Sequence, residues 1–272
     1  MSLQGKTLFI TGASRGIGRE IALRAARDGA NIVIAAKSAE PHAKLPGTIH
    51  SVAAEVEAAG GKALALQLDV RDETAVKAAM AQAFDHFGGI DALVNNAGAI
   101  KLVGVEKLEP KRFDLMFQIN TRAVMVCSQA ALPYLKQSKG HILSLSPPLN
   151  LDPKWFASYG PYTTTKYGMS MLTLGMSEEF KKYGISVNSL WPKTVIATAA
   201  IEFEAGGPAV MKAARLPAIM ADAAHAILST EGRSLSGRLL IDEEILREQG
   251  QSEFEQYRYD PAGTLISDLF VD

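Results

Sequence analysis

The feature that most constrains the fold is a regular alternation of short apolar runs with longer helical patterns. The runs are four to six residues long and span 7–10, 31–36, 63–68, 90–94, 141–145, 185–190 and 238–241. Between most of them the apolar spacing is that of amphipathic helices, such as the one that Asp72 is placed to cap and that Gly88-Gly89 ends. This alternation predicts an α/β fold with one doubly wound parallel sheet of about seven strands, flanked by helices.

The expected domain organisation is simple. Nothing in the 272 residues resembles a linker, a repeat or a low-complexity segment, and α/β chains of ~250 residues often fold as one unit. We therefore expect a single domain over residues 1–272, with residues 243–272 as a C-terminal extension packed on it.

Composition narrows the expected partners and location. The formal net charge is −1 and no basic run stands out, so neither nucleic acid nor a membrane surface is an expected partner. The single cysteine, Cys127, lies among apolar residues, which indicates a buried structural thiol in a reducing compartment. No signal-peptide core or stretch of ~18 apolar residues is evident, so we expect a cytoplasmic protein.

A glycine-rich turn follows the first apolar run. Its sequence, Thr11-Gly12-Ala13-Ser14-Arg15-Gly16-Ile17-Gly18, has the spacing GxxxGxG and leads into the first helical pattern. Glycines in this position let the backbone approach a pyrophosphate, whose charge is favoured at a helix N-terminus. The turn predicts a Rossmann-type dinucleotide site that includes Gly12, Ser14, Arg15, Gly16, Ile17 and Gly18.

The end of the second run bears on which dinucleotide binds. An acidic residue about 20 positions past the glycines would bond the adenosine ribose of NAD. This chain has Lys37-Ser38 there, and Lys37 together with Arg15 would place two cations near a 2′-phosphate, which predicts NADP(H) as the cofactor. The third run ends in Asp69-Val70, where Asp69 would either accept a bond from the adenine, with Val70 flanking the ring, or only cap the next turn.

Tyr162 and Lys166 form a YxxxK segment at the start of a helical pattern. At positions i and i+4 the two side chains lie on one helix face. A tyrosine with a pKa of ~10 is a poor acid–base catalyst at neutral pH, and a nearby ammonium lowers that pKa by favouring the phenolate. Of the seven tyrosines only Tyr162 has a lysine four residues later, and it follows the fifth run.

Four motifs together resemble the short-chain dehydrogenase family over roughly residues 5–242. They are the turn TGASRGIG, Asn95-Asn96-Ala97-Gly98, Asn120 and the segment YTTTK, in that order. The segments 143–150 (LSLSPPLN) and 191–194 (WPKT) further resemble the hydroxysteroid dehydrogenase-like protein 2 subfamily. Its animal members carry an additional sterol-carrier domain that this sequence lacks, so we expect a stand-alone reductase.

The resemblance implies a role for each matching position. Tyr162 would protonate a carbonyl oxygen while the nicotinamide delivers hydride, and Lys166 would lower the tyrosine pKa and bind the ribose. Asn96 would support the sheet edge and contact the cofactor, and Asn120 would hold a water in a proton relay. Pro192 and Thr194 would contact the nicotinamide.

Two positions depart from the family pattern. The serine that usually bonds the substrate oxygen falls on Pro147, which has no side-chain donor. Ser146 is adjacent, but neighbouring strand residues point to opposite faces of the sheet. Three alternatives stay open: a local distortion turns Ser146 toward the substrate oxygen, Asn150 donates the hydrogen bond instead, or Tyr162 holds the oxyanion alone. Loss of such a donor costs on the order of 10²–10³ in rate. Lys193 replaces the usual glycine after Pro192 and would reshape the nicotinamide pocket.

The sequence therefore predicts an NADP(H)-dependent reductase, or the reverse dehydrogenase, acting on a small apolar carbonyl compound or alcohol. Six apolar residues fall in loops that would border the substrate or pack a lid: Leu149, Trp155, Phe156, Trp191, Ile196 and Phe203. The histidines and acidic residues show no metal-ligand spacing, so no metal is expected. A non-catalytic NADP(H)-binding sensor or scaffold is the alternative.

The family also implies a homodimer or homotetramer formed by its two longest helices, here about 111–135 and 162–183. The Ala- and Met-rich faces of these helices fit that pairing, and core packing within one chain explains them nearly as well. The residues concerned are Ala123, Met125, Ala130, Met169, Met171 and Met176.

Overall fold

A computed structural model describes residues 2–43, 45–204 and 206–271 of the chain. Within them a seven-stranded sheet, parallel throughout, has the order β3-β2-β1-β4-β5-β6-β7, which confirms the predicted Rossmann-type fold class. The strands are β1 (Thr7–Thr11), β2 (Asn31–Ala36), β3 (Lys62–Gln67), β4 (Ala92–Asn95), β5 (His141–Ser144), β6 (Ser186–Trp191) and β7 (Leu239–Ile241). The order reverses between β1 and β4, and in such sheets ligands bind at the carboxyl ends of the strands beside this reversal.

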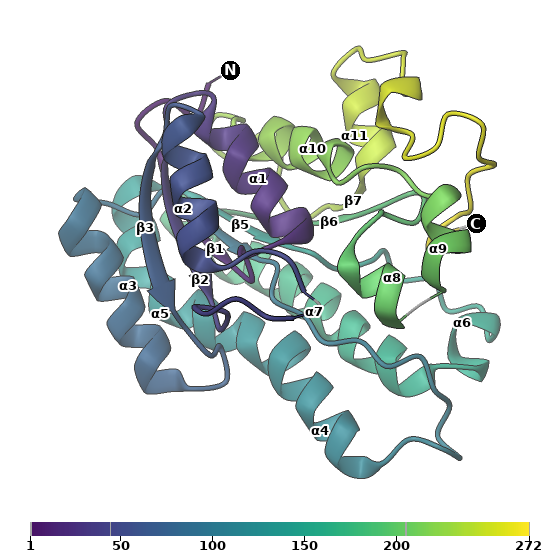
Figure 1. The fold of residues 1–272 in the computed structure, drawn as a ribbon. Coiled ribbons are helices and arrows are strands. Elements are labelled where there is room, and N and C mark those ends of the chain that lie inside the picture. Colours follow the sequence, from purple (N-terminus) through teal and green to yellow (C-terminus); the bar gives the residue numbers. More distant parts are fainter. Residues whose placement is uncertain (1, 44, 205, 272) are drawn as a thin grey trace.

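Helices cover both faces of the sheet, as Figure 1 shows. The longer ones are α1 (Gly16–Ala26), α2 (Ile49–Ala58), α3 (Glu73–Phe87), α4 (Pro110–Phe117), α5 (Ala123–Ser138), α7 (Gly160–Glu179) and α10 (Ala218–Leu228). Shorter helices are α6 (Lys154–Ala157), α8 (Ala199–Glu204), α9 (Gly207–Lys212) and α11 (Asp242–Glu248). None of the described helices is both long enough and apolar enough to cross a lipid bilayer.

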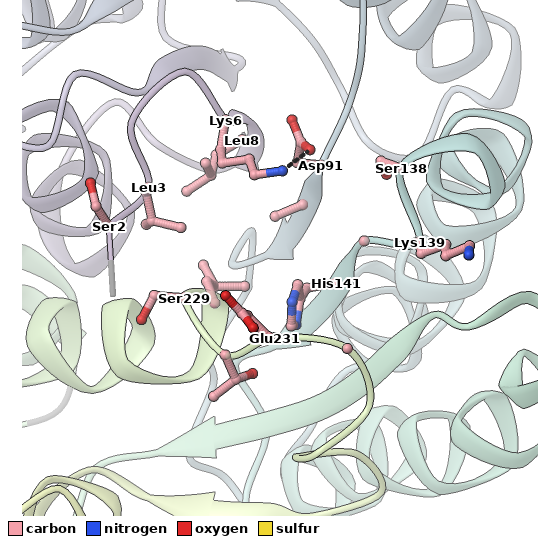
Figure 2. Close-up of a pocket in the computed structure, with 15 residues that line it drawn as sticks. Ser2, Leu3, Lys6, Leu8, Asp91, Ser138, Lys139, His141, Ser229 and Glu231 are labelled. Carbon is pink, nitrogen blue, oxygen red and sulfur yellow. Dashed lines mark hydrogen bonds and ion pairs between the residues drawn. The ribbon is translucent and has the colours of Figure 1, made fainter.

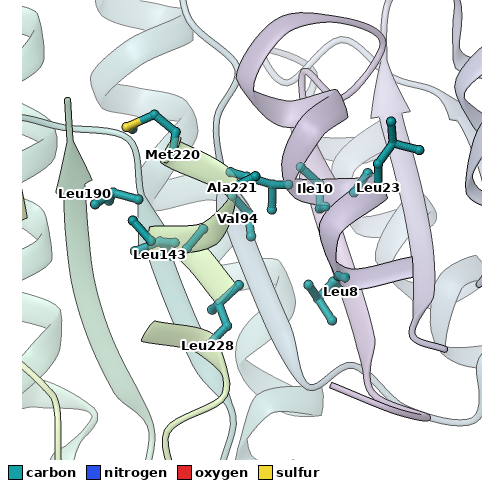
Figure 3. Close-up of a cluster of buried hydrophobic side chains, with 14 of the residues drawn as sticks. Leu8, Ile10, Leu23, Val94, Leu143, Leu190, Met220, Ala221 and Leu228 are labelled. Atoms are coloured by element: carbon teal, nitrogen blue, oxygen red, sulfur yellow. The ribbon is translucent and has the colours of Figure 1, made fainter. Parts of the chain in front are cut away.

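Two hydrophobic cores lie on opposite faces of the sheet because successive strand side chains alternate in direction. In β1, Leu8 and Ile10 join a core with α1, α2 and α10, whereas Phe9 joins a core with α3, α5 and α7. Figure 3 shows Leu8 and Ile10 in the first core, together with Leu228 of α10. Both faces are apolar, as a parallel sheet covered by helices requires.

The structure differs from the sequence-based boundaries at two places near the carboxyl edge. The helix expected from Pro110 to about Leu135 is interrupted by a π turn at Gln118–Arg122, between α4 and α5. The fifth strand, expected to reach Leu145, ends at Ser144. π turns are rare and often lie at functional sites, and this one contains Asn120.

The C-terminal extension packs against the sheet and α10. α11 is followed by a 3-10 turn at Glu255–Tyr257. Phe254, just before this turn, and Tyr257, within it, both belong to the first core. The Tyr257 hydroxyl donates a hydrogen bond to Asp222 of α10 at 2.7 Å. In Figure 1 the yellow end of the chain then runs from α11 past α9.

A hollow of about 360 Å³ opens at the amino ends of the strands, on the edge opposite the expected site. Lys6, Asp91 and His141 line it, and Figure 2 shows the ion pair of 3.0 Å between Lys6 and Asp91. Ligands of such sheets bind at the carboxyl ends of the strands. The candidate functional site is therefore expected at that edge and not in this hollow.

Candidate active site

The glycine turn packs directly against the end of β4. Gly12 has φ +67°, a left-handed conformation that glycine adopts at no steric cost, and a Cβ there would lie 2.8 Å from Ala97 Cα. A Cβ on Gly18 would overlap the Asn96 amide nitrogen and lie 3.0 Å from Asn96 Cγ. The two glycines therefore allow the turn and the segment after β4 to meet without a gap.

Asn96 and Thr11 hold this contact together. Asn96 Nδ2 donates to the carbonyl oxygens of Thr11 (2.8 Å) and Gly12 (3.0 Å). The Thr11 hydroxyl accepts the backbone N–H groups of Asn96 (3.0 Å) and Ala97 (3.1 Å), and it donates to Val94 O at 3.2 Å. Asn96 and Thr11 therefore join the glycine turn to the end of β4. Thr11 was not among the expected site residues, although it opens the motif.

The two predicted cations both already have partners: Arg15 lies in the glycine turn just before α1, and Lys37 directly follows β2. Arg15 donates to Ser38 Oγ at 3.0 Å and to the carbonyl oxygens of Pro46 (2.8 Å) and Gly47 (3.1 Å). Lys37 Nζ lies 3.3 Å from Asp69, and the Lys37 side chain remains 63% exposed. Arg15 and Ser38 thus form one polar cluster at the place predicted for the adenosine ribose.

Asp69 is held mainly by a neighbour that the sequence analysis did not single out. Arg71 binds its carboxylate through Nε (3.0 and 3.1 Å) and Nη2 (2.6 Å). These hydrogen bonds from Arg71, with a smaller contribution from Lys37, hold the pKa of Asp69 well below its usual range. Val70 beside it is buried. An adenine at this edge would meet a carboxylate that is fully ionised at neutral pH.

Asn120 ties the π turn to the start of α7. Its Oδ1 accepts Ala99 N–H at 2.8 Å, and its Nδ2 donates to Ala99 O and to Thr165 Oγ1, both at 3.0 Å. Thr165 Oγ1 in turn donates to the carbonyl oxygen of Tyr162 at 2.8 Å. The side chain of Asn120 is fully buried and bonded at both ends, so it fixes the first turn of α7.

Tyr162 and Lys166 lie one helical turn apart on the buried face of α7. Lys166 Nζ donates to Leu145 O at 2.5 Å, just beyond β5, and lies 4.9 Å from the centroid of the Trp191 ring. Burial lowers the pKa of Lys166 to about 7. Burial, and to a lesser degree the Asp268 carboxylate, raise the pKa of Tyr162 above its usual value. The expected lowering of the Tyr162 pKa by Lys166 is therefore not found in this arrangement.

The chain bends immediately after β5. Ser146 N–H donates to Ser144 O at 3.0 Å, so the strand alternation assumed for Pro147 does not continue to it. Ser146 is fully buried, and its hydroxyl makes no hydrogen bond within the described parts of the chain. The backbone of Asn150, the other candidate donor, is bonded to the hydroxyl of Tyr167.

The segment after β6 carries the predicted nicotinamide contacts. Pro192 and Thr194 are both buried, and Thr194 Oγ1 has no hydrogen-bond partner among residues 2–43, 45–204 and 206–271. Lys193 points toward α11, where Nζ lies 2.8 Å from Glu243 and its N–H donates to Asp242 at 2.9 Å. Lys193 in place of glycine therefore anchors the C-terminal extension.

An aromatic cluster covers the proton-transfer pair. Tyr162, Tyr167 and Trp191 belong to it, with Phe270 from the C-terminal end of the chain. Of the six apolar loop residues expected near a substrate, Leu149, Trp155, Phe156 and Trp191 lie in this cluster. Ile196 belongs instead to the first core, and Phe203 is 50% exposed. Phe270 was missed, since no sequence pattern connects it to the site.

The residues present fit a dinucleotide. The turn has glycines at 12, 16 and 18, where the backbone carries no Cβ, next to a helix N-terminus, and Arg15 with Ser38 supplies hydrogen-bond donors where the adenosine ribose would lie. The buried Thr194 hydroxyl has no partner within the described part of the chain. A buried polar group of this kind normally has one, which the nicotinamide end of a cofactor would provide.

Comparison with known proteins agrees with this geometry. The family model for short chain dehydrogenases matches residues 6–205, and the chain belongs to that family of oxidoreductases, as its motifs predicted. Hydroxysteroid dehydrogenase-like protein 2 of Xenopus laevis is 57% identical over 271 residues, which cover 99% of this chain and 64% of the relative. The chain thus spans less than two thirds of the length of that curated relative.

Solved structures extend the comparison. A crystal structure from Xanthomonas campestris is 55% identical, with complete coverage of both chains and a TM-score of 0.96. A short chain dehydrogenase from Burkholderia cenocepacia J2315 in complex with NADP is 32% identical, covers 89% of this chain and 97% of its own, and has a TM-score of 0.75.

Proposed function

We propose that this chain is an NADP(H)-dependent oxidoreductase that interconverts an apolar carbonyl compound and its alcohol. The observation that carries the proposal is the placement of Tyr162 and Lys166. Both are buried on α7, against the carboxyl ends of β5 and β6 and beneath an aromatic cluster. A nicotinamide cofactor bound at this edge supplies or accepts the hydride.

In reduction, the carbonyl carbon gains the hydride and the Tyr162 hydroxyl gives its proton to the carbonyl oxygen, which becomes the alcohol. Burial keeps Tyr162 protonated, which is the form that this step needs. Lys166 stands one turn away to stabilise the tyrosinate that is left and to bond the ribose. Asn120 positions both through its bond to Thr165, and Thr194 and Pro192 hold the nicotinamide end.

Ser146 is the second donor that we propose for the carbonyl oxygen. The bend after Ser144 frees Ser146 from strand alternation, and its buried hydroxyl has no partner in the described chain. It lies one residue beyond Leu145, whose carbonyl oxygen accepts Lys166 Nζ.

The test of the reaction is NADPH consumption with a panel of apolar ketones and aldehydes. Tyr162→Phe should lower turnover by roughly 10²–10⁴-fold with unchanged NADPH affinity, because it removes only the proton donor. Tyr134→Phe is the matched control, since Tyr134 packs against Phe84 in the α3–α5 layer. Tight NADPH binding without turnover on any compound would favour the sensor alternative.

The cofactor preference rests on Arg15, Ser38 and Lys37 at the ends of the glycine turn and β2. Lys37→Ala should weaken NADPH binding by about tenfold and leave NADH binding unchanged, because only NADPH carries the 2′-phosphate. Lys62→Ala, at the amino end of β3, is the control. Equal dissociation constants of the two cofactors in the wild-type protein would contradict the preference.

We also propose that α4, α5 and α7 form a homo-oligomer interface. Phe117, Met125, Met171 and Leu174 are exposed on these helices, which supports an apolar partner surface. Met169, Met176 and Ala123 are buried within the chain and belong to its own core. A monomer mass from light scattering would contradict the proposal.

A further inference from the structure

The C-terminal segment returns to the candidate active site and lies along residues 191–195. Val195 N–H donates to Ile266 O at 3.1 Å, and Asp268 N–H donates to Lys193 O at 3.0 Å. Trp191 Nε1 donates to Leu269 O at 2.8 Å. The tail therefore pairs with the same stretch that carries the proposed nicotinamide contacts.

The next residue, Phe270, fills the centre of the aromatic cluster. Its side chain is only 1% exposed. Its ring centroid lies 5.2 Å from that of Tyr167, 5.8 Å from those of Trp155 and Trp191, and 6.5 Å from that of Tyr159. It also stacks on Tyr162, with centroids 6.4 Å apart and an interplanar angle of 25°. A ring of the chain itself thus occupies the apolar space over the proposed proton donor.

The backbone of Phe270 is strained in this position. Its φ of +72° lies in the left-handed region, which bulky residues rarely adopt. Such conformations persist where surrounding contacts hold them, and they cluster at ligand clamps and switch segments. Beyond the 3-10 turn the tail has no regular helix or strand, only single bridges such as the one between Ser267 and Thr194. Release of the tail would therefore break no helix or strand of the described chain, although it would break the hydrogen bonds to residues 191–195 and the ring contacts of Phe270.

We propose that the cage of Trp155, Tyr159, Tyr167 and Trp191 is the substrate subsite for an aromatic ring, and that Phe270 fills it until the substrate displaces the tail. The inference rests on the proposed function and narrows its substrate class to aryl ketones and aldehydes or the matching alcohols. A benzene ring in the cage makes the edge-to-face and stacked contacts that Phe270 makes, and a carbonyl beside that ring reaches the side of Tyr162.

Space for the rest of a substrate lies next to the cage. Met116 packs in the same cluster as Tyr162 and Phe270, and it also lines a hollow of about 340 Å³ with Ala99 and Ile100. A substituent on the ring would extend into that hollow, whose lining residue Ala99 is held in place by its hydrogen bonds to Asn120.

The test follows the ring itself. In the full chain, 4-fluorophenylalanine replaces Phe270, and its ¹⁹F NMR signal is recorded with NADP⁺ while ethylbenzene is added. Ethylbenzene has the ring but no carbonyl, so the readout does not depend on catalysis. We expect one signal of a buried ring, and with ethylbenzene a second, solvent-exposed signal that grows to saturation. The same label at Phe203, outside the cluster, should not respond.

An unmoved Phe270 signal up to the solubility limit of ethylbenzene overturns the proposal and makes the ring a fixed wall of the pocket. Tighter ethylbenzene binding by Phe270→Ala would not decide the matter, because any new apolar cavity binds such ligands. Reduction of aryl ketones separates the two proposals. Displacement of Phe270 together with no turnover on any carbonyl compound of the panel keeps the ring site and contradicts the proposed function. Turnover of aryl ketones without displacement keeps the proposed function and overturns the subsite.

Discussion

Replacement of Gly18 by alanine tests the contact between the glycine turn and the end of β4. A Cβ at residue 18 would overlap Asn96 Nδ2 and lie 3.0 Å from both Asn96 Cγ and Gly12 O. The Asn96 side chain must then turn away and give up its hydrogen bonds to Thr11 O and Gly12 O. Each hydrogen bond contributes about 1 kcal/mol net, so the loss of both lowers the free energy of unfolding by roughly 2 kcal/mol. The higher helix propensity of alanine offsets less than about 1 kcal/mol of this loss.

The expected result is a loss of about 1–2 kcal/mol in the free energy of unfolding. For a chain of this size that corresponds to a fall of roughly 2–8 °C in Tm. The displaced turn is the proposed pyrophosphate site, so NADPH binding should weaken as well. A loss of about 1.4 kcal/mol in binding free energy corresponds to a tenfold higher dissociation constant, which is the size of effect that we expect. Thermal unfolding and NADPH fluorescence titration measure the two effects. Gly89→Ala is the control, because a Cβ there meets nothing within 4 Å.

A double-mutant cycle locates the cause. In an Asn96→Ala background the amide is gone, so Gly18→Ala should cost no more than about 0.5 kcal/mol, which gives a coupling energy of roughly 1 kcal/mol. Additive costs in the two single variants would refute the reasoning, because they would show that the alanine harms the turn without acting through Asn96.

Three further predictions concern single side chains. Burial raises the pKa of Glu243, but hydrogen bonds from Lys193, Arg215 and Arg247 outweigh it and bring the pKa down to about 2. Glu243→Gln should therefore lower the free energy of unfolding by about 3 kcal/mol at pH 7. The difference from the wild-type protein should vanish as the pH falls from about 4.5 to 2. Urea titrations at several pH values measure it, and a difference that does not change with pH would refute this prediction. Ser146→Ala should lower kcat by about 10²-fold, whereas Ser144→Ala, which removes another buried hydroxyl without a partner in the described chain, should leave kcat within about threefold. Burial raises the pKa of the Cys127 thiol to about 12, so an aromatic disulfide reagent should label it only at the rate of unfolding, and rapid labelling of the native protein would contradict its burial.

The parts of the molecule that the sequence predicted are those encoded locally. The apolar period located all seven strands of the described sheet to within a few residues, and the glycine turn and the YxxxK segment fell at its carboxyl edge. The family resemblance added Asn96 and Asn120, whose side chains are indeed bonded to the turn and to the first turn of α7. Each of these features depends on residues close together in the chain or on a fixed strand order.

The parts that the sequence did not predict depend on contacts between distant residues. Lys193 meets Glu243 fifty positions later, and Phe270 reaches Tyr162 across more than a hundred. No period or spacing indicates which aromatic residue of an irregular tail enters a pocket. The π turn was missed for a related reason, because one extra residue in a helix barely changes its apolar pattern. Burial raises the pKa of Tyr162, whereas the YxxxK spacing indicated a lowered value, because a spacing does not show how deeply a side chain is buried.

The tail also connects one departure from the family pattern, Lys193, to the chemistry. Lys193 binds α11 and accepts the N–H of Asp268, and this anchoring places Phe270 over Tyr162. Burial lowers the pKa of Lys166 to about 7. A neutral lysine cannot stabilise the tyrosinate that proton donation leaves behind. Lys166 must therefore be protonated at the moment when Tyr162 gives up its proton.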